Sequence, residues 1–129
     1  METNKNFPLP ETCKELGEAF PEWETELYLN SQKFTYKSNR DGAITGGVEL
    51  RAYPAPSFQE LWEKLPDMLI TNAINNETHD LVIKRDYMFY EHNTLAEIRI
   101  FTVPIIDNHV TEAMAQMLLK LKKEGYLDE

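Results

Sequence analysis

The feature that most constrains the fold is an apolar stripe near the C-terminus that follows the period of an α-helix. Apolar side chains recur there every three or four positions, at Val110, Ala113, Met114, Met117, Leu118 and Leu121. This spacing gathers them on one side of a helix that runs from about residue 110 to residue 123. Gly125 follows, and its freedom to adopt the left-handed conformation suits it to end that helix. We therefore predict an amphipathic helix with one buried face.

A second stripe with helical spacing lies near the middle of the chain, at Phe58, Leu61, Trp62 and Leu65. Ser57 and Glu60 stand three residues apart at its start, which is the pattern of a capping box. Pro66 would end this helix, because proline cannot continue the helical hydrogen bonds. The same reasoning predicts a shorter first helix over residues 10–20.

The remaining segments alternate between apolar and polar residues, which is typical of β-strands. They are residues 25–30, 33–37, 48–53, 80–84, 87–91 and 97–103, with a short extended piece at 68–71. We expect a tail over residues 1–9 and a single α+β domain over residues 10–129. In this domain an antiparallel sheet of about five or six strands carries the two main amphipathic helices on one face.

An internal likeness leaves two interpretations open. Residues 49–53 and 97–101 match in type at every position, and each segment follows a predicted hairpin and precedes a proline and a helix. Either the chain is a doubled β-β-β-α unit, or the likeness is a coincidence between two amphipathic strands. The order of the strands in the two halves distinguishes these interpretations.

Charge and hydropathy narrow the range of partners. The 129 residues include 22 acidic and 13 basic side chains, which gives a net charge of −9. Phosphate contacts need Lys and Arg, so direct binding to nucleic acid is not expected. The longest stretch without a charged residue, 68–76, has nine residues, whereas a membrane-spanning helix needs about 20 apolar ones. Residues 1–10 lack the apolar core of a secretory signal, so we expect a cytoplasmic protein without a membrane anchor.

The residue types that carry chemistry form no recognisable site. Cys13 is the single cysteine, and its position suits a small buried side chain on a helix face. His79, His92 and His109 have no metal-ligand spacing. Catalytic and nucleotide-binding motifs are missing from the sequence. We therefore predict no catalytic residue, no metal and no cofactor.

Two places could form an interaction surface. Alternation puts Arg51, Tyr53, Arg99 and Phe101 on the face of the sheet away from the helices. Arginine and aromatic side chains are common in protein interfaces, although alternating Glu and Arg also pair across strands for structural reasons. In residues 53–62, prolines and three large rings either border a groove near Trp62 or anchor the second helix to the sheet.

Two segments also carry a resemblance. Residues 53–66, Tyr-Pro-Ala-Pro-Ser-Phe-Gln-Glu-Leu-Trp-Glu-Lys-Leu-Pro, together with residues 111–118 and Lys123-Glu124-Gly125, resemble small uncharacterised proteins encoded by bacterial phages and prophage-like elements. The resemblance extends over the last two-thirds of the chain. It implies a genetic context but no activity, cofactor or catalytic residue.

These observations favour a nonenzymatic accessory protein that binds another, still unidentified, protein. One alternative is a small enzyme or small-molecule binder with a pocket near Trp62. Another is a DNA mimic that occupies a basic protein. Its acidic surface would come from Glu11, Glu15, Glu18, Glu22, Glu24 and Glu26, which are accompanied by one lysine, Lys14.

Overall fold

The computed structural model describes residues 5–30, 35–38, 52–72, 74, 77–95 and 98–127. Its helices are α1 (Pro10–Ala19), α2 (Phe58–Lys64) and α3 (Val110–Glu124). Its strands are β1 (Leu27–Asn30), β2 (Thr35–Ser38), β3 (Ala52–Pro54), β4 (Met68–Asn72), β5 (Glu77–Ile83), β6 (Tyr87–His92) and β7 (Arg99–Pro104). The α+β class and most element positions agree with the prediction from the sequence.

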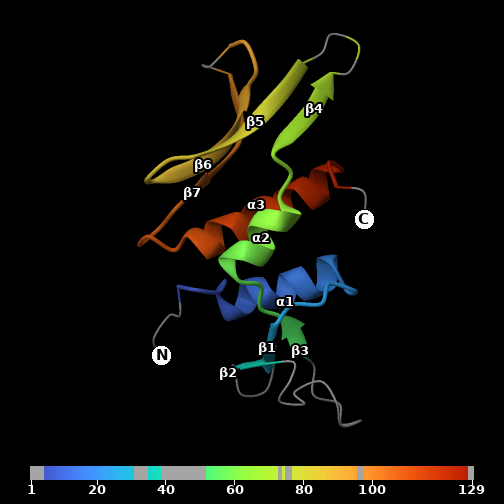
Figure 1. The fold of residues 1–129 in the computed structure, drawn as a ribbon, viewed down its shortest axis with the longest axis vertical. Coiled ribbons are helices and arrows are strands. Elements are labelled where there is room, and N and C mark those ends of the chain that lie inside the picture. Colours follow the sequence, from blue (N-terminus) through green and yellow to red (C-terminus); the bar gives the residue numbers. More distant parts are fainter. Residues whose placement is uncertain are drawn as a thin grey trace.

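The strands form two antiparallel sheets instead of one. The smaller sheet has the order β2-β1-β3 and the larger has the order β4-β5-β6-β7. The helices lie between them, with α2 and α3 next to the larger sheet and α1 next to the smaller one (Figure 1). The prediction of one sheet with five or six strands was therefore wrong, whereas the two main helices, α2 and α3, do lie on one face of the larger sheet. Alternation identifies a strand but carries no information about which strand it pairs with.

The strand order also rejects the doubled β-β-β-α unit. Among the described strands, β1 is the central strand of the smaller sheet, so the first strand of that half lies in the middle. In the larger sheet the strands follow one another in chain order. A true duplication would keep one order in both halves, so the likeness between residues 49–53 and 97–101 is a coincidence of two amphipathic segments.

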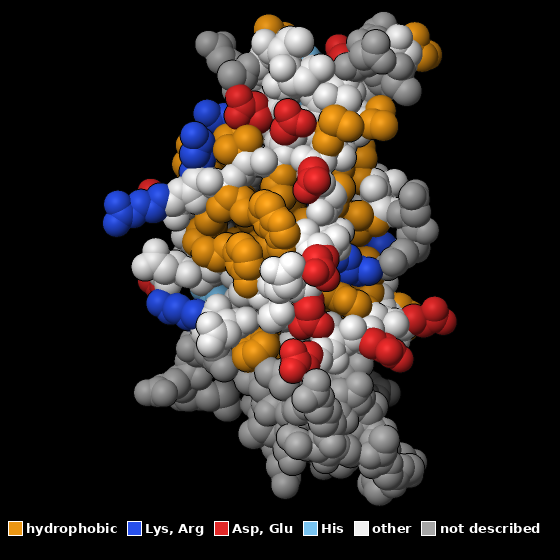
Figure 2. Space-filling model, viewed as in Figure 1, with side chains coloured by type: hydrophobic (Ala, Val, Ile, Leu, Met, Phe, Trp, Pro, Cys, Tyr) orange, Lys and Arg blue, Asp and Glu red, His pale blue; other side chains and the backbone are white. Residues whose placement is uncertain are grey.

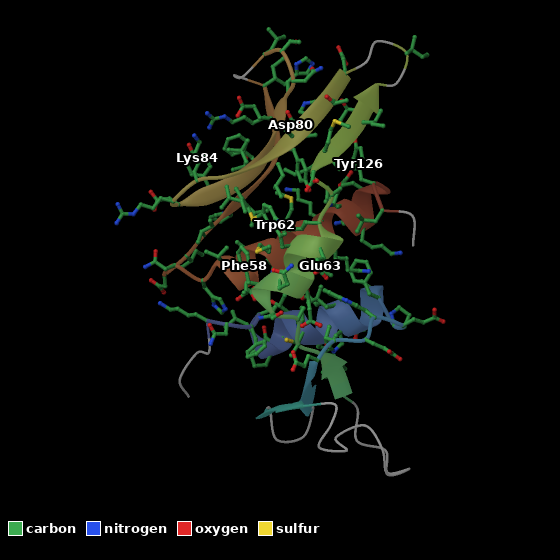
Figure 3. The ribbon with its side chains drawn as sticks, in the orientation of Figure 1. Phe58, Trp62, Glu63, Asp80, Lys84 and Tyr126 are labelled. Atoms are coloured by element: carbon green, nitrogen blue, oxygen red, sulfur yellow. The ribbon has the colours of Figure 1, made fainter. Side chains whose placement is uncertain are left out.

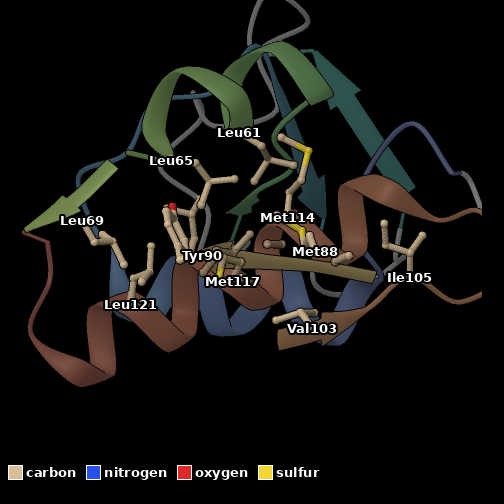
Figure 4. Packing of buried hydrophobic residues seen from close by; sticks show 14 of the residues in the cluster. Leu61, Leu65, Leu69, Met88, Tyr90, Val103, Ile105, Met114, Met117 and Leu121 are labelled. Atoms are coloured by element: carbon tan, nitrogen blue, oxygen red, sulfur yellow. The ribbon is translucent and has the colours of Figure 1, made fainter. Parts of the chain in front are cut away.

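One apolar core joins the helices to the larger sheet (Figure 4). From α3 the core takes most of the predicted stripe, with Met114, Met117, Leu118 and Leu121 fully covered. It also takes Ala115, which the stripe did not include, whereas Val110 is only partly buried. From α2 the core takes Leu61 and Leu65, and from the strands it takes Leu69, Met88, Tyr90 and Val103. The hydroxyl group of Tyr90 donates a hydrogen bond to the carbonyl oxygen of Pro66 at 2.8 Å, so the one polar atom of this ring is satisfied.

The predicted helix ends are confirmed. The Ser57 side chain accepts from the Glu60 N–H, and the Glu60 side chain accepts from the Ser57 N–H, which completes the capping box. Gly125 has a φ of +83° and ends α3 in the left-handed conformation. At the other sheet, Gly17 lets α1 approach β3 closely, because a Cβ there would lie 3.1 Å from Tyr53 Cδ1.

Residues 5–9, which the sequence suggests are part of a tail, are bonded to the start of α3. The carbonyl oxygen of Phe7 lies 2.6 Å from His109 Nε2, and that of Lys5 accepts from the Thr111 hydroxyl at 2.8 Å. A carbonyl oxygen can only accept, so His109 carries a proton on Nε2. These bonds hold the N-terminal segment against α3.

Candidate functional site

The most conspicuous surface feature is a pair of exposed aromatic side chains on α2. Phe58 and Trp62 keep 47% and 43% of their surface exposed. Their rings are stacked, with centroids 6.1 Å apart and an interplanar angle of 8° (Figure 3). The expectation that both rings anchor α2 to a sheet was therefore wrong. The pair instead presents an apolar surface to solvent.

The geometry of α2 explains this exposure. Successive residues of a helix are about 100° apart, so the four apolar positions form a stripe about 100° wide. Leu61 and Leu65 occupy one half of the stripe and are buried against the core. Phe58 and Trp62 occupy the other half, beyond the part that the core covers. The helical period identifies the stripe, but it does not tell how much of it a neighbour will cover.

The aromatic pair stands on a fixed support. The capping box satisfies the main chain at the start of α2, and the second oxygen of Glu60 accepts from the N–H of Glu26 at 3.0 Å. At the end of the helix, Leu65 N–H donates to Leu61 at 2.9 Å. The two rings are therefore carried by a short helix whose ends are both held by hydrogen bonds. Because this helix is already ordered, binding a partner would cost little conformational entropy.

A hollow of about 610 Å³ adjoins Phe58. Phe7 and Val110 contribute apolar side chains to its lining, and Lys5, Gln59 and Asn108 contribute polar ones. In the space-filling view an apolar area occupies the centre of the face that carries Phe58 and Trp62 (Figure 2). This hollow is large enough to receive one apolar side chain of a partner.

Acidic side chains border the aromatic pair. Glu63 of α2 is exposed. In Figure 2 acidic side chains form a column beside the apolar area, and Figure 3 places Glu63 next to Phe58 and Trp62. The Gln59 side chain donates to Glu63 at 3.0 Å, which holds that carboxylate on the outer side of the helix. Acidic side chains thus lie along one side of the apolar area, whereas Lys and Arg side chains lie on its other side (Figure 2).

A second and larger hollow of about 1170 Å³ lies along α3. The end of β7 and the 106–109 segment form one wall, and side chains of α3 form the other. The α3 wall mixes acidic Glu112 and Glu124 with basic Lys120 and Lys123, so it selects no sign of charge. Trp62 lines neither of these two hollows, and the predicted pocket near Trp62 corresponds most closely to the hollow beside Phe58.

Of the four residues of the predicted sheet-face surface, the three that the structure describes do not come together. Arg51 lies outside the described residues. Tyr53 belongs to β3 of the smaller sheet, where it is half-buried and packs with Cys13 and Ala55. Arg99 and Phe101 belong to β7 of the larger sheet, on the far side of the helices.

Arg99 and Phe101 also diverge from each other. The Arg99 guanidinium lies 4.3 Å from the centre of the Phe89 ring and donates to the Tyr87 hydroxyl at 3.2 Å. Phe101 has a φ of +55° at a register shift between β6 and β7, which breaks the strand alternation. Its ring therefore packs toward the core and meets Tyr126 at 5.4 Å.

Two of the three histidines are neighbours in the larger sheet. His79 of β5 pairs with His92 of β6, and their rings are perpendicular with centroids 5.1 Å apart. The Thr71 hydroxyl donates to the Glu77 carbonyl oxygen, so it accepts from His79 Nδ1 at 3.0 Å. Burial and the neighbouring His92 lower the pKa of His79. The neutral ring then carries its proton on Nδ1.

This assignment determines which nitrogens of the two rings can donate a hydrogen bond and which can accept one. His79 Nε2 is a buried acceptor without a hydrogen-bond partner among the described residues. His92 Nδ1 accepts from the N–H groups of Thr94 and Leu95 at 3.2 and 3.1 Å, so the neutral His92 ring carries its proton on Nε2. Within the ranges that the structure describes, no three His, Cys, Asp or Glu side chains converge as a metal ion would need.

The remaining candidates keep ordinary structural roles. Cys13 is buried, and its thiol lies 3.6 Å from the carbonyl oxygen of Pro8. Burial first, and the charge of Glu112 second, raise the pKa of this thiol to about 12. All six glutamates of the predicted acidic surface are exposed, namely Glu11, Glu15, Glu18, Glu22, Glu24 and Glu26. They form the solvated side of α1 and the segment after it.

Comparison with protein-family models, curated proteins and solved structures finds no match for this chain. The resemblance to phage and prophage proteins therefore stays a prediction. Across the described parts of the chain, we find no helix with the length and apolar character that a membrane span requires.

Proposed function

We propose that this chain is a nonenzymatic accessory protein that binds another protein through the exposed Phe58–Trp62 pair. The observation that carries the proposal is the exposure of two stacked rings on a helix whose other apolar side chains are buried. Large aromatic side chains are enriched among the residues that dominate binding energy at interfaces. In this proposal the partner covers the half of the apolar stripe that the core leaves open.

The partner carries an apolar anchor flanked by basic side chains. The hollow beside Phe58 receives the anchor, and the acidic side of the apolar area, which includes Glu63, faces the basic groups. The net charge of −9 adds a long-range attraction for such a partner. In line with the resemblance, the protein acts in the cytoplasm as an accessory protein of a phage or prophage.

The two tryptophans of the chain give a direct test. In a Trp23→Phe variant, Trp62 becomes the single tryptophan and reports on its own surroundings. The probe is a synthetic amphipathic peptide of leucine and lysine, and its control is the same peptide with glutamate for lysine. We expect the basic peptide to shift the Trp62 emission to shorter wavelength and the acidic peptide to leave it unchanged.

A variant of the site distinguishes specific binding from nonspecific hydrophobic binding. Phe58→Ala should weaken binding of the basic peptide by about tenfold or more, because truncation of a central interface residue costs about 1.4 kcal/mol or more. Ile106→Ala is the matched control, since Ile106 is 68% exposed and does not line the hollow beside Phe58. Equal binding of the two peptides, or equal losses in the two variants, would refute the proposed surface.

The same variants identify a natural partner. A host protein captured by the wild-type chain should be lost with Phe58→Ala and kept with Ile106→Ala. Its binding should also weaken as salt rises, because the acidic side of the apolar area is exposed to solvent. A partner that binds Phe58→Ala as well as the wild-type chain, but that salt releases, would instead support the DNA-mimic alternative. That partner would bind the acidic side of α1.

A further inference from the structure

Among the described residues, one edge of the larger sheet is open to pairing. In the order β4-β5-β6-β7, the outer strands are β4 and β7. Met68 pairs with Asp80, so Asp67 lies opposite Leu81, and the Leu81 N–H donates to the Asp67 carbonyl oxygen at 2.9 Å. In an antiparallel ladder the bonded residues alternate, so Leu69 also faces β5. The main-chain groups of Met68 and Ile70 therefore point outward, toward the free edge.

The two edges differ in the features that prevent pairing. Strand β7 carries Arg99, the left-handed Phe101 and Pro104, and each of these hinders the approach of another strand. Strand β4 has no charged residue and no proline. It begins the longest uncharged stretch of the sequence, residues 68–76, in a chain with 35 charged side chains, 22 acidic plus 13 basic. Its register shift lies after Ile70, so Met68 and Ile70 remain in regular pairing.

The outward face of β4 is also apolar. Met68 and Ile70 are 47% and 61% exposed, whereas Leu69 between them is 2% exposed and belongs to the core. The helices cover the other face of this sheet (Figure 1). An edge whose main-chain groups have no partner in the described part of the chain, and which carries exposed apolar side chains, is a template for a further strand.

We propose that a second copy of this chain pairs with β4, antiparallel and about a two-fold axis at Leu69. Met68 then lies opposite Ile70 of the partner subunit, and Ile70 lies opposite Met68 of the partner subunit. Their outward N–H and C=O groups bond to each other, and the exposed Met68 and Ile70 side chains pack as cross-strand pairs. The two larger sheets become one continuous sheet.

Charge favours this edge for self-pairing. Each copy has a net charge of −9, so two copies approach most easily where neither carries a charge. In the proposed register Asp67 faces Thr71 of the partner subunit rather than another acid. The Asp80 side chains of the two copies are separated by three strand spacings, about 14 Å, which exceeds the screening length of about 8 Å at physiological salt. The same residues meet on both sides, as a two-fold interface requires.

Sedimentation equilibrium over a range of concentrations up to about 1 mM tests the proposal. We expect the wild-type protein to dimerise, and Ile70→Lys to raise the dissociation constant by at least about tenfold, because it places like charges at the interface. Ile106→Lys is the control, since Ile106 is exposed to a similar extent but lies outside β4. A wild-type protein that stays monomeric, or a dimer that survives Ile70→Lys, overturns the proposal.

Two more variants test the register without relying on charge. Ile70→Pro removes an outward N–H and leaves the bonds to β5 intact, so it should weaken the dimer while the circular dichroism spectrum is kept. In a Cys13→Ser background, an equal mixture of Met68→Cys and Ile70→Cys chains should form a disulfide faster than either chain alone. Directly opposed residues lie about 5.5 Å apart between Cα atoms, which suits a disulfide. Faster crosslinking within either single variant would contradict this register.

Discussion

Glu112 of α3 caps helix α1, which lies about a hundred residues earlier in the chain. Removal of this carboxylate should destabilise the protein measurably. Helix α1 has no side-chain cap of its own. Instead, the Leu9 N–H donates to Glu112 Oε1 at 2.8 Å, and the Thr12 hydroxyl donates to Oε2 at 2.7 Å. The carboxylate also lies at the positive end of the α1 dipole. It therefore acts as an N-terminal cap supplied by another helix.

The expected cost of Glu112→Ala is about 2 kcal/mol. Loss of a cap costs about 1 kcal/mol, and loss of a charged acceptor for the part-buried Thr12 hydroxyl costs about another 1 kcal/mol. Water replaces the bond from the exposed Gln116 side chain, so that bond adds little. Glu112→Gln keeps one acceptor and loses the charge, so about 1 kcal/mol is expected.

Urea unfolding followed by circular dichroism measures these differences. Glu124→Ala is the matched control, because Glu124 is the last residue of α3 and is exposed. A negative charge there opposes the helix dipole, so its removal should raise stability by a few tenths of a kcal/mol. In a double-mutant cycle with Thr12→Val, the coupling should be about 1 kcal/mol. A loss below about 0.5 kcal/mol for Glu112→Ala would refute the capping argument.

Three further predictions concern buried groups. Burial and His92 lower the pKa of His79, so the unfolded chain binds a proton near pH 6.5 that the folded chain does not. The melting temperature should therefore fall as the pH drops below about 6.5, and His79→Leu should flatten this slope; an unchanged slope would contradict the assignment. Tyr90→Phe removes the donor to the Pro66 carbonyl oxygen and should cost about 1 kcal/mol in urea unfolding, whereas no loss would show that water replaces the bond. Cys13 should react with a thiol reagent at pH 8 only as fast as the protein unfolds, because burial raises its pKa to about 12; reaction at the rate of a free thiol would contradict its burial.

The elements of this fold were predictable from the sequence because each depends on a local pattern. The capping box at Ser57 and the stop at Gly125 each involve residues within one or two helical turns, and the stripe of α3 repeats within a single helix. The pairing of strands was not predictable in this way. Strands β3 and β7 show the same alternation, yet they lie in different sheets, because α1 and α3 separate them.

The site depends on information that no local pattern contains. Phe58 and Trp62 have the same helical spacing as Leu61 and Leu65, and only the width of the packed surface decides which pair is exposed. The Phe101 side chain does not lie on its predicted face, because the pairing of β6 with β7 contains a register shift. The Glu112 cap requires α1 and α3 to lie side by side, which is a property of the whole fold.

The aromatic pair and the open edge are parts of one rigid unit. Only Leu65, Pro66 and Asp67 separate α2 from β4. Leu65 is buried, the Pro66 carbonyl oxygen accepts from Tyr90, and that of Asp67 accepts from Leu81. A dimer through β4 would therefore hold two Phe58–Trp62 surfaces at a fixed separation. A partner with two matching sites would gain avidity from that arrangement without any new contact, because its second binding step becomes intramolecular.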